Sequence, residues 1–229
     1  MGKRGDRAFV TLTRIIVLAN SWKNQDWCLA GIEPATGKWV RPVTRLEDGR
    51  VRQSDMKLGG RSPQVLDVFD LPLDATGPDF DFESENRTIL PGQWHLHGRA
   101  SPSDLLKYAN RSCYILHNRK KYVTIDEMRQ KPIEKRTTLQ LAHVDDFAIR
   151  DARSPSSEKH NWKGVVSSGG RELELTITDP AFCEKLTKGY EPSTSCLLTM
   201  SLSMPYKPPE WEEDEPPVCW KLIAGVIEL

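Results

Sequence analysis

The sequence predicts an all-β protein made of two tandem Greek-key barrels with short helices and a connecting spacer. Short runs rich in β-branched residues alternate with Gly- and Pro-containing turns along the 229 residues. Residues 137–229 hold three strand patterns, one helix pattern and two further strand patterns, and residues 1–98 repeat this order loosely. A five-stranded barrel of the OB type fits this order of elements.

The first half begins with "FVTLTRIIVLA" (9–19), which is rich in β-branched residues and too polar at Thr11, Thr13 and Arg14 for a buried helix. Two more strands are joined by the short turn "PATG", which predicts a hairpin. The helix that follows the third strand of an OB barrel would fall on "QSDMKLGG". The remaining predicted strands of this half are 26–33, 38–43, 65–73 and a region over 88–97.

The second half follows the plan more closely. "GRELELTITD" alternates strictly, with Leu173, Leu175 and Ile177 on one face, and "SSGG" before it predicts a hairpin. "DPAFCEKLTKGY" predicts a helix, with Asp179 as its N-cap and Pro180 in its first turn. The other predicted strands are 137–151, 161–168, 196–206 and 219–229.

Residues 99–136 form a spacer between the predicted barrels, which span 1–98 and 137–229. Within the spacer, "SPSDLLKYAN" predicts a helix capped by Ser101 or Ser103. "CYILH" (113–117) predicts a strand, and the spacer ends in the basic run "RQKPIEKR".

The formal net charge is zero, but the charges are segregated along the chain. Residues 1–53 hold ten Lys or Arg against five Asp or Glu, and residues 99–136 hold ten against four. Residues 67–85 hold seven acids and no base, and "EWEEDE" near the C-terminus holds five acids. Two basic segments are compatible with a polyanionic partner, although charged loops also serve simply to solvate a surface.

Cysteine usage and hydropathy predict a reducing, cytoplasmic location. The five Cys residues are odd in number and scattered, with no pair at CxxC spacing, so a disulfide framework is not expected. Arg14 interrupts the apolar part of the N-terminal segment, and no segment approaches the ~20 apolar residues of a membrane-spanning helix. We therefore expect neither a signal peptide nor a membrane partner.

Four segments, "RIIVLANSWK", "AGIEPATGKWVRPV", "VLDVFDLPL" and "CWKLIAGVIEL", together resemble the bacterial dual OB-containing domain family. The resemblance spans nearly the whole chain and consists of strand and turn patterns rather than a catalytic signature. It implies two tandem OB-like barrels in a small bacterial cytoplasmic protein, with a nucleic-acid role and a place in an anti-phage or other conflict system.

Aromatic and basic residues gather in the first three predicted strands, which include the surface where OB barrels usually receive oligonucleotides. In "GKWVRPV", Val40 is expected to point inward, so that Trp39 and Arg41 project outward together. A ring beside a guanidinium suits a stacked base flanked by a phosphate contact. The alternative is that the Trp residues pack the barrel wall. The candidate nucleic-acid-binding residues are Trp22, Lys23, Trp27, Trp39, Arg41, Arg45, Arg50 and Arg52.

The equivalent face of the second half differs, because Glu172 and Glu174 would point outward and repel a phosphate backbone. A basic aromatic patch elsewhere on this half is possible from Trp162, Lys163, Trp220 and Lys221. The alternative is that the two Trp residues are structural. This half is therefore expected to contact protein, such as a helicase or nuclease partner.

No catalytic or cofactor motif stands out. "HLH" (95–97) with Cys113 or His117 has the residue types of a metal site, but no further pair has ligand spacing. A Mg²⁺-dependent nuclease would need several oxygen ligands. Acidic residues are present, but no Glu-x-Lys strand motif of the kind found in nucleases follows them. There is no GxSxG elbow, P-loop or GxGxxG. We expect a non-catalytic module that binds single-stranded DNA or RNA without a cofactor, or alternatively an interaction subunit. A nuclease or hydrolase whose acidic residues are scattered along the sequence is the third alternative. The acids considered for Mg²⁺ are Asp67, Asp70, Asp74, Asp79 and Asp81.

Overall fold

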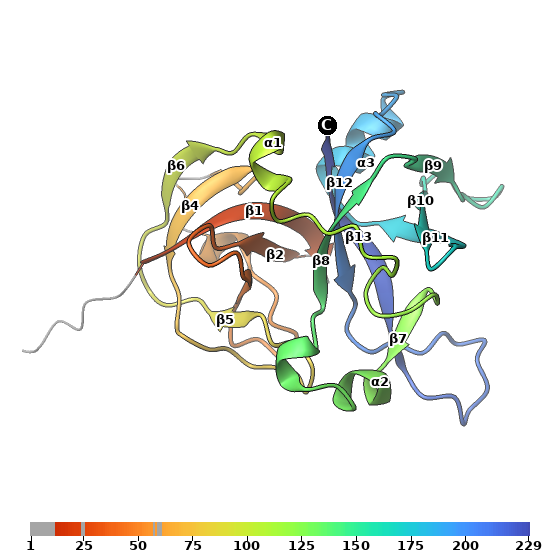
Figure 1. Ribbon diagram of the computed structural model, residues 1–229, viewed down its shortest axis with the longest axis horizontal. Coiled ribbons are helices and arrows are strands. Elements are labelled where there is room, and N and C mark those ends of the chain that lie inside the picture. The colour runs from red at the N-terminus through yellow and green to blue at the C-terminus, as the bar shows by residue number, and fades with distance from the viewer. Residues whose placement is uncertain (1–11, 24–25, 57, 59–60) are drawn as a thin grey trace, which may run out of the picture.

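The structure is a computed structural model, and it describes residues 12–23, 26–56, 58 and 61–229. Two curled sheets lie side by side, and the spacer crosses their junction (Figure 1). The first sheet comprises β1 (Leu12–Lys23), β2 (Asp26–Ile32), β3 (Trp39–Val43), β4 (Asp67–Pro72), β5 (Asn86–Thr88) and β6 (His95–Arg99). The second comprises β8 (Leu139–Val144), β9 (Ala148–Asp151), β10 (Trp162–Ser168), β11 (Arg171–Ile177), β12 (Cys196–Leu202) and β13 (Val218–Glu228), and β7 (Tyr122–Thr124) pairs with β13.

The strand order closes the first sheet into a barrel. Its neighbours run β5-β3-β2-β1-β4-β6, with β3 and β5 parallel. Because β5 and β6 follow one another in the chain, they are two parts of one broken fifth strand that pairs with the third strand at one end and the fourth at the other. The region over 88–97, predicted as a strand, is thus divided between the two parts, and a single bridge from Leu73 to Ile89 joins them to the end of β4.

The second barrel closes in the same order, but its first strand is the broken one. Its neighbours run β8-β12-β13-β11-β10-β9, with β11 and β13 parallel. β8 and β9 together make the strand predicted over 137–151, and the break at 145–147 turns Phe147 into the core. Both barrels therefore have the OB order in which strand one pairs with two and four, and strand three with five. The all-β, dual-barrel prediction is confirmed.

One predicted helix forms as expected, and the others are shorter than predicted. α3 (Pro180–Thr187) lies where expected, and the Asp179 carboxylate accepts the Phe182 N–H at 3.1 Å. In the first barrel, "QSDMKLGG" forms only the short helix η1 (Gln53–Asp55), and residues 57 and 59–60 of that segment lie outside the described residues. The spacer contains α1 (Pro102–Leu105), which begins after Ser101 as expected, α2 (Ile125–Arg129) and η2 (Ile133–Lys135).

The strand predicted over 113–117 is wrong. This segment forms consecutive turns, with positive φ at Leu116 (41°) and His117 (82°). Side chains of the second barrel take the place of a strand partner: Ser168 Oγ accepts the Ile115 N–H at 2.9 Å, and Gln140 Oε1 accepts the Leu116 N–H at 2.7 Å. These contacts bind the segment to the barrel without a β-ladder.

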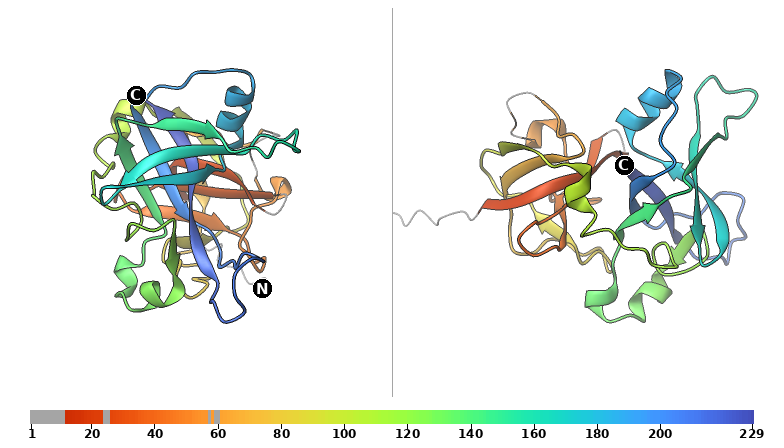
Figure 2. Two further views of the ribbon diagram at one scale, coloured as in Figure 1. Left: turned by 90° about the vertical axis from the view of Figure 1, so that its right-hand side faces the viewer. Right: turned by 45° about the horizontal axis from the view of Figure 1, so that its top comes forward.

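The outer face of β1, β2 and β3 is covered by β8, β12 and β13 of the second barrel (Figure 2). The Thr199 hydroxyl donates to the Leu18 carbonyl at 2.7 Å across this interface, and a Cβ on Gly225 would overlap the same carbonyl oxygen. Phe82 of the first half even joins the core of the second barrel. The apolar residues at this interface are Ile16, Leu18, Ala19, Ala30, Ile32, Leu105, Leu139, Leu141, Leu197, Ala224 and Ile227.

The spacer also contributes to the packed structure. Leu105 lies in the interface between the barrels, and Val123 and Met128 lie in the second core. The predicted boundaries at 98 and 137 stay predictions. The longest helix in the described part of the chain, α3, has 8 residues, so none of the described helices is long enough to cross a membrane.

Candidate nucleic-acid interface

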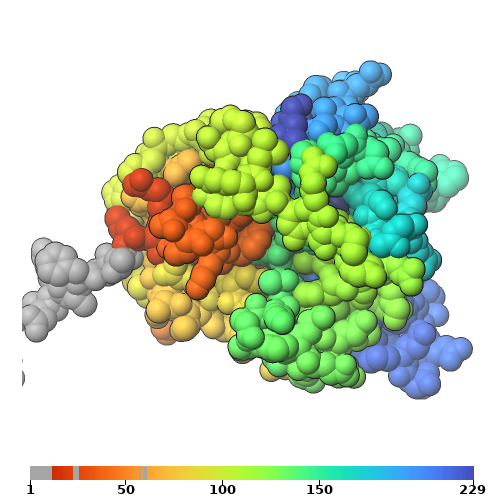
Figure 3. Space-filling view, viewed as in Figure 1, coloured from red at the N-terminus to blue at the C-terminus, as the bar shows by residue number. Residues whose placement is uncertain are grey.

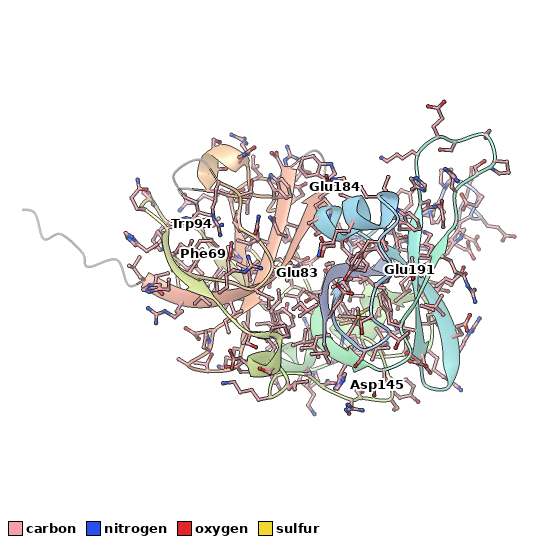
Figure 4. All side chains as sticks on the ribbon, turned by 90° about the horizontal axis from the view of Figure 1, so that it is seen from above. Phe69, Glu83, Trp94, Asp145, Glu184 and Glu191 are labelled. Atoms are coloured by element: carbon pink, nitrogen blue, oxygen red, sulfur yellow. The ribbon has the colours of Figure 1, made fainter. Side chains whose placement is uncertain are left out.

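The prediction that Arg41 is exposed for phosphate contact is wrong. Val40 points into the first core as expected, so Arg41 does leave the barrel on the side of Trp39, but that side faces the second barrel. Arg41 is only 4% exposed, forms an ion pair with Glu83 and donates to Thr138 Oγ1 at 2.9 Å. Figure 4 shows Glu83 between the two barrels. Arg41 is therefore part of the junction.

Burial and the neighbouring carboxylates shift the pKa of Arg41 in opposite directions. Burial alone would lower the pKa of the guanidinium, but Glu83 and Glu85 raise it above its ordinary value. Burial raises the pKa of Glu85 despite Arg41, and Thr138 donates to this carboxylate from its N–H at 2.6 Å and its hydroxyl at 3.1 Å. These interactions join three parts of the chain: β3, which holds Arg41; the loop before β5, which holds Glu83 and Glu85; and Thr138, directly before β8.

The other candidates of the first barrel differ in exposure and in their partners. Trp22 is 56% exposed and meets the partly buried Trp27 edge-on, with ring centroids 4.6 Å apart. Arg50 forms ion pairs with Asp26 at 3.1 Å and Asp48 at 3.2 Å.

Two further candidates, Arg45 and Arg52, are exposed and line one hollow beside Asp55. The side chain of Lys23 lies outside the described residues. Trp39 is half-buried and lines a groove at the junction. The role of this whole set in nucleic-acid binding stays a prediction.

In the second barrel, the face of β10 and β11 is open, unlike the corresponding face of the first barrel. A hollow of about 460 Å³ lies there, beside the loop between β12 and β13. Lys163 and Trp220, which the sequence suggests for a basic aromatic patch, both line this hollow. Lys221 also borders the hollow, but it is buried and its ammonium group binds backbone carbonyls of the spacer. The hollow is lined by Lys121, Lys163, Glu174, Leu175, Thr176, Ser203, Tyr206, Trp220, Lys221 and Leu222.

The Trp220 ring is held in place by its neighbours. Its centroid lies 5.4 Å from that of Tyr122 and 5.7 Å from that of Trp211. Its Nε1–H donates to the Tyr206 carbonyl at 3.3 Å, while the Tyr206 side chain is 54% exposed. A ring fixed in this way stacks on a planar ligand without losing much conformational entropy.

Two lysines in the hollow, Lys121 and Lys163, form no close ion pair among the described residues, although the Glu174 carboxylate lies near enough to interact with both charges. Lys163 Nζ donates to Thr176 Oγ1 at 2.7 Å, and burial, together with the nearby Lys121, lowers its pKa. Glu174 is the only acid lining the hollow, and Arg150 binds its carboxylate at 2.7 Å. The predicted repulsion by outward carboxylates is thus partly offset, since Arg150 also pairs with Glu172 at 3.3 Å. The acidic run 210–215 lies in the neighbouring loop.

Lys221 anchors the turns over 113–118. It is 2% exposed, and its Nζ donates to the Ile115 carbonyl at 2.5 Å, the Asn118 carbonyl at 2.7 Å and Asn118 Oδ1 at 3.0 Å. Burial lowers the pKa of Lys221 to about 8. The sequence offered no signal for this buried role.

Several of the residues considered for metals have other partners. His97 lies 2.6 Å from Asp70, which also pairs with Arg14, and His117 contacts the Thr137 carbonyl at 2.7 Å. Asp67 is fully buried and pairs with Arg99 at 3.0 Å. Within the part of the chain that the structure describes, no group of three or more His, Cys, Asp or Glu is placed to hold a metal ion.

Another cavity, of about 730 Å³, lies between the barrels beside α3. Its arginines, Arg61 and Arg99, both bind the carboxylate of Asp67. Glu184 and Glu228 also line it, so it offers a phosphate less free positive charge than the hollow on the second barrel.

Comparison with known proteins supports the architecture. The family model of the dual OB-containing domain matches residues 13–226, nearly the whole chain. No curated protein and no solved structure matches the sequence.

Proposed function

The chain belongs to the dual OB-containing domain family, and we propose that it binds single-stranded nucleic acid, without catalysis, on the outer face of its second barrel. The proposal rests mainly on one observation: a fixed Trp220 ring and two lysines that form no close ion pair among the described residues line a single hollow there. Stacking on the ring and pairing of Lys121 and Lys163 with phosphates together supply both parts of single-strand recognition.

The packing of the two barrels favours this face over the one on the first barrel. Strands two and three of an OB barrel, with the loops after strands one and four, form its usual oligonucleotide surface. In the first barrel Ala30 and Trp39 of that surface pack against Leu139 and Ala224. In the second barrel the corresponding strands, β10 and β11, carry the hollow.

The acidic loop limits the direction in which a strand leaves the hollow. Glu210, Glu212 and Glu213 would repel phosphates on one side. A basic segment of Arg119, Lys120 and Lys121, all exposed, also borders the hollow. We expect the strand to run toward this basic segment. A cytoplasmic location and a place in a bacterial defence system accord with the proposal and stay predictions.

Fluorescence anisotropy with labelled DNA and RNA strands of about 16 nucleotides, at about 50 and about 200 mM salt, tests the proposal. Replacing Lys121 and Lys163 by Ala should lower affinity and reduce the salt slope by roughly one to two. The matched control replaces Lys185 and Lys188 of α3, which lies at the other end of the second barrel from β7 (Figure 1).

If the Lys121/Lys163 variant and the control bound with equal affinity, the hollow would not be part of the binding site. If the wild-type protein bound neither DNA nor RNA, the proposal would fail, and a protein-interaction role would lead.

A further inference from the structure

A second groove, of about 400 Å³, lies at the junction of the two barrels and the spacer. Its lining segments meet on the face shown in Figure 3, where residues of the spacer, in yellow-green and green, cross between the barrels. None of its twelve lining residues is acidic. They are Trp39, Tyr108, Asn110, Ser112, Tyr114, Leu116, His117, Lys131, Thr137, Leu139, Gln140 and Leu141.

Three aromatic rings line the groove from different parts of the chain. Trp39 begins β3, Tyr108 follows α1, and Tyr114 lies in the turns over 113–118. The Tyr108 hydroxyl donates to the Pro34 carbonyl at 3.3 Å, and Lys107 Nζ lies 4.9 Å from the Tyr108 ring centroid. Tyr114 is 42% exposed. Rings held at a groove of this size suit flat, unstacked bases.

The polar groups of the groove are ordered, and its one lysine is free of carboxylates. Gln140 Nε2 donates to Asn110 Oδ1 at 3.1 Å and to the Tyr114 carbonyl at 3.3 Å, which fixes the turn that carries Tyr114. Lys131 is half-buried and has no acidic partner among the described residues. A half-buried ammonium beside aromatic rings is a site for an anion attached to a planar group.

An exposed basic segment joins this groove to the hollow on the second barrel. His117 lines the groove and Lys121 lines the hollow, so the two sites are at most about 14 Å apart along the backbone. Between them, the side chains of Arg119 and Tyr114 both pack over Gly169, and Lys120 is exposed. A single nucleic-acid strand is long enough to contact both sites.

We propose that the groove stacks bases of the same single strand that crosses the second barrel, with Arg119, Lys120 and Lys121 pairing with the phosphates between the two sites. This inference rests on the proposed function. It assigns part of the site to residues of both barrels and the spacer, so that neither barrel alone would hold the complete strand.

Strands of two lengths test the inference. Replacing Tyr114 and Lys131 by Ala should lower affinity for a strand of about 16 nucleotides by about tenfold or more, and affinity for one of about 4 nucleotides much less. Tyr114→Phe should retain the affinity, because it retains the ring. The matched control, Tyr190→Ala with Lys188→Ala, removes an exposed tyrosine and a lysine at α3. Photo-crosslinking with a bromouridine strand should give adducts on Tyr108 or Tyr114.

The outcomes separate the two proposals. If the Lys121/Lys163 variant loses affinity while the Tyr114/Lys131 variant matches its control at both lengths, the groove inference is wrong and the proposed function stands. If only the Tyr114/Lys131 variant loses affinity, the strand binds at the groove and the hollow is not its main site. Absence of binding by the wild-type protein overturns both.

Discussion

Replacing Arg41 by Met should destabilise the protein strongly, although the sequence alone predicts a mild effect for a surface arginine. Among the described residues, the change leaves the carboxylate of Glu83, whose side chain is 3% exposed, with Asn86 Nδ2 at 2.7 Å as its remaining side-chain hydrogen-bond donor. Removing one partner of a buried ion pair costs ~3–5 kcal/mol, because the other charge stays buried without compensation. The lost hydrogen bond to Thr138 acts in the same direction.

The loss should depend on pH. Burial raises the pKa of Glu85 in the native state, and Arg41 opposes that rise. A carboxyl group with a raised native pKa stabilises the fold at low pH, and this contribution is lost as pH rises through the native pKa. Without Arg41 the native pKa rises further, so the variant should lose more free energy of unfolding at pH 8 than at pH 5.

Urea denaturation of wild type, Arg41→Met, Glu83→Gln and the double variant measures these terms. We expect the double variant to be less destabilised than the sum of the single variants, with a coupling free energy of about 1–3 kcal/mol. A loss below about 1 kcal/mol for Arg41→Met, with unchanged pH dependence, would refute the assignment of Arg41 to a buried ion pair.

Two further predictions concern buried groups of the second barrel. Because its native pKa is about 8, Lys221 binds fewer protons in the native than in the unfolded state between pH 8 and 10.5. Its contribution to stability should therefore rise with pH. Relative to Lys221→Met, wild type should gain roughly 2 kcal/mol from pH 7 to pH 10 in urea denaturation, and parallel pH curves would contradict this. Gly225→Ala would force a Cβ onto the Leu18 carbonyl. It should lower the free energy of unfolding by about 1–3 kcal/mol, whereas the control Ser167→Ala on the exposed side of β10 should change it little, and equal stability of the two would argue against close contact of the barrels.

Much of the fold was predictable because strands and capped helices leave local patterns. The alternation of Leu173, Leu175 and Ile177 identified the inner face of β11, and all three residues are buried. Asp179 and Pro180 marked the start of α3, and Val40 was correctly directed inward. The predicted strand over 113–117 failed because its apolar residues are buried by turns whose N–H groups bond to side chains distant in sequence.

Local sequence patterns were enough to predict the two barrels, their element order and the inner side of their best-patterned strands, since periodicity and turn residues act over a few neighbouring positions. Which outer faces of the barrels remain open depends instead on how the two barrels pack together. Arg41 leaves the first barrel as its position predicts, yet a second barrel covers it, and Glu83 from a distant loop forms its ion pair. The groove with Tyr108, Tyr114 and Lys131 likewise requires both barrels and the spacer. Its residues are far apart in sequence, and their proximity depends on long-range packing that no local pattern encodes.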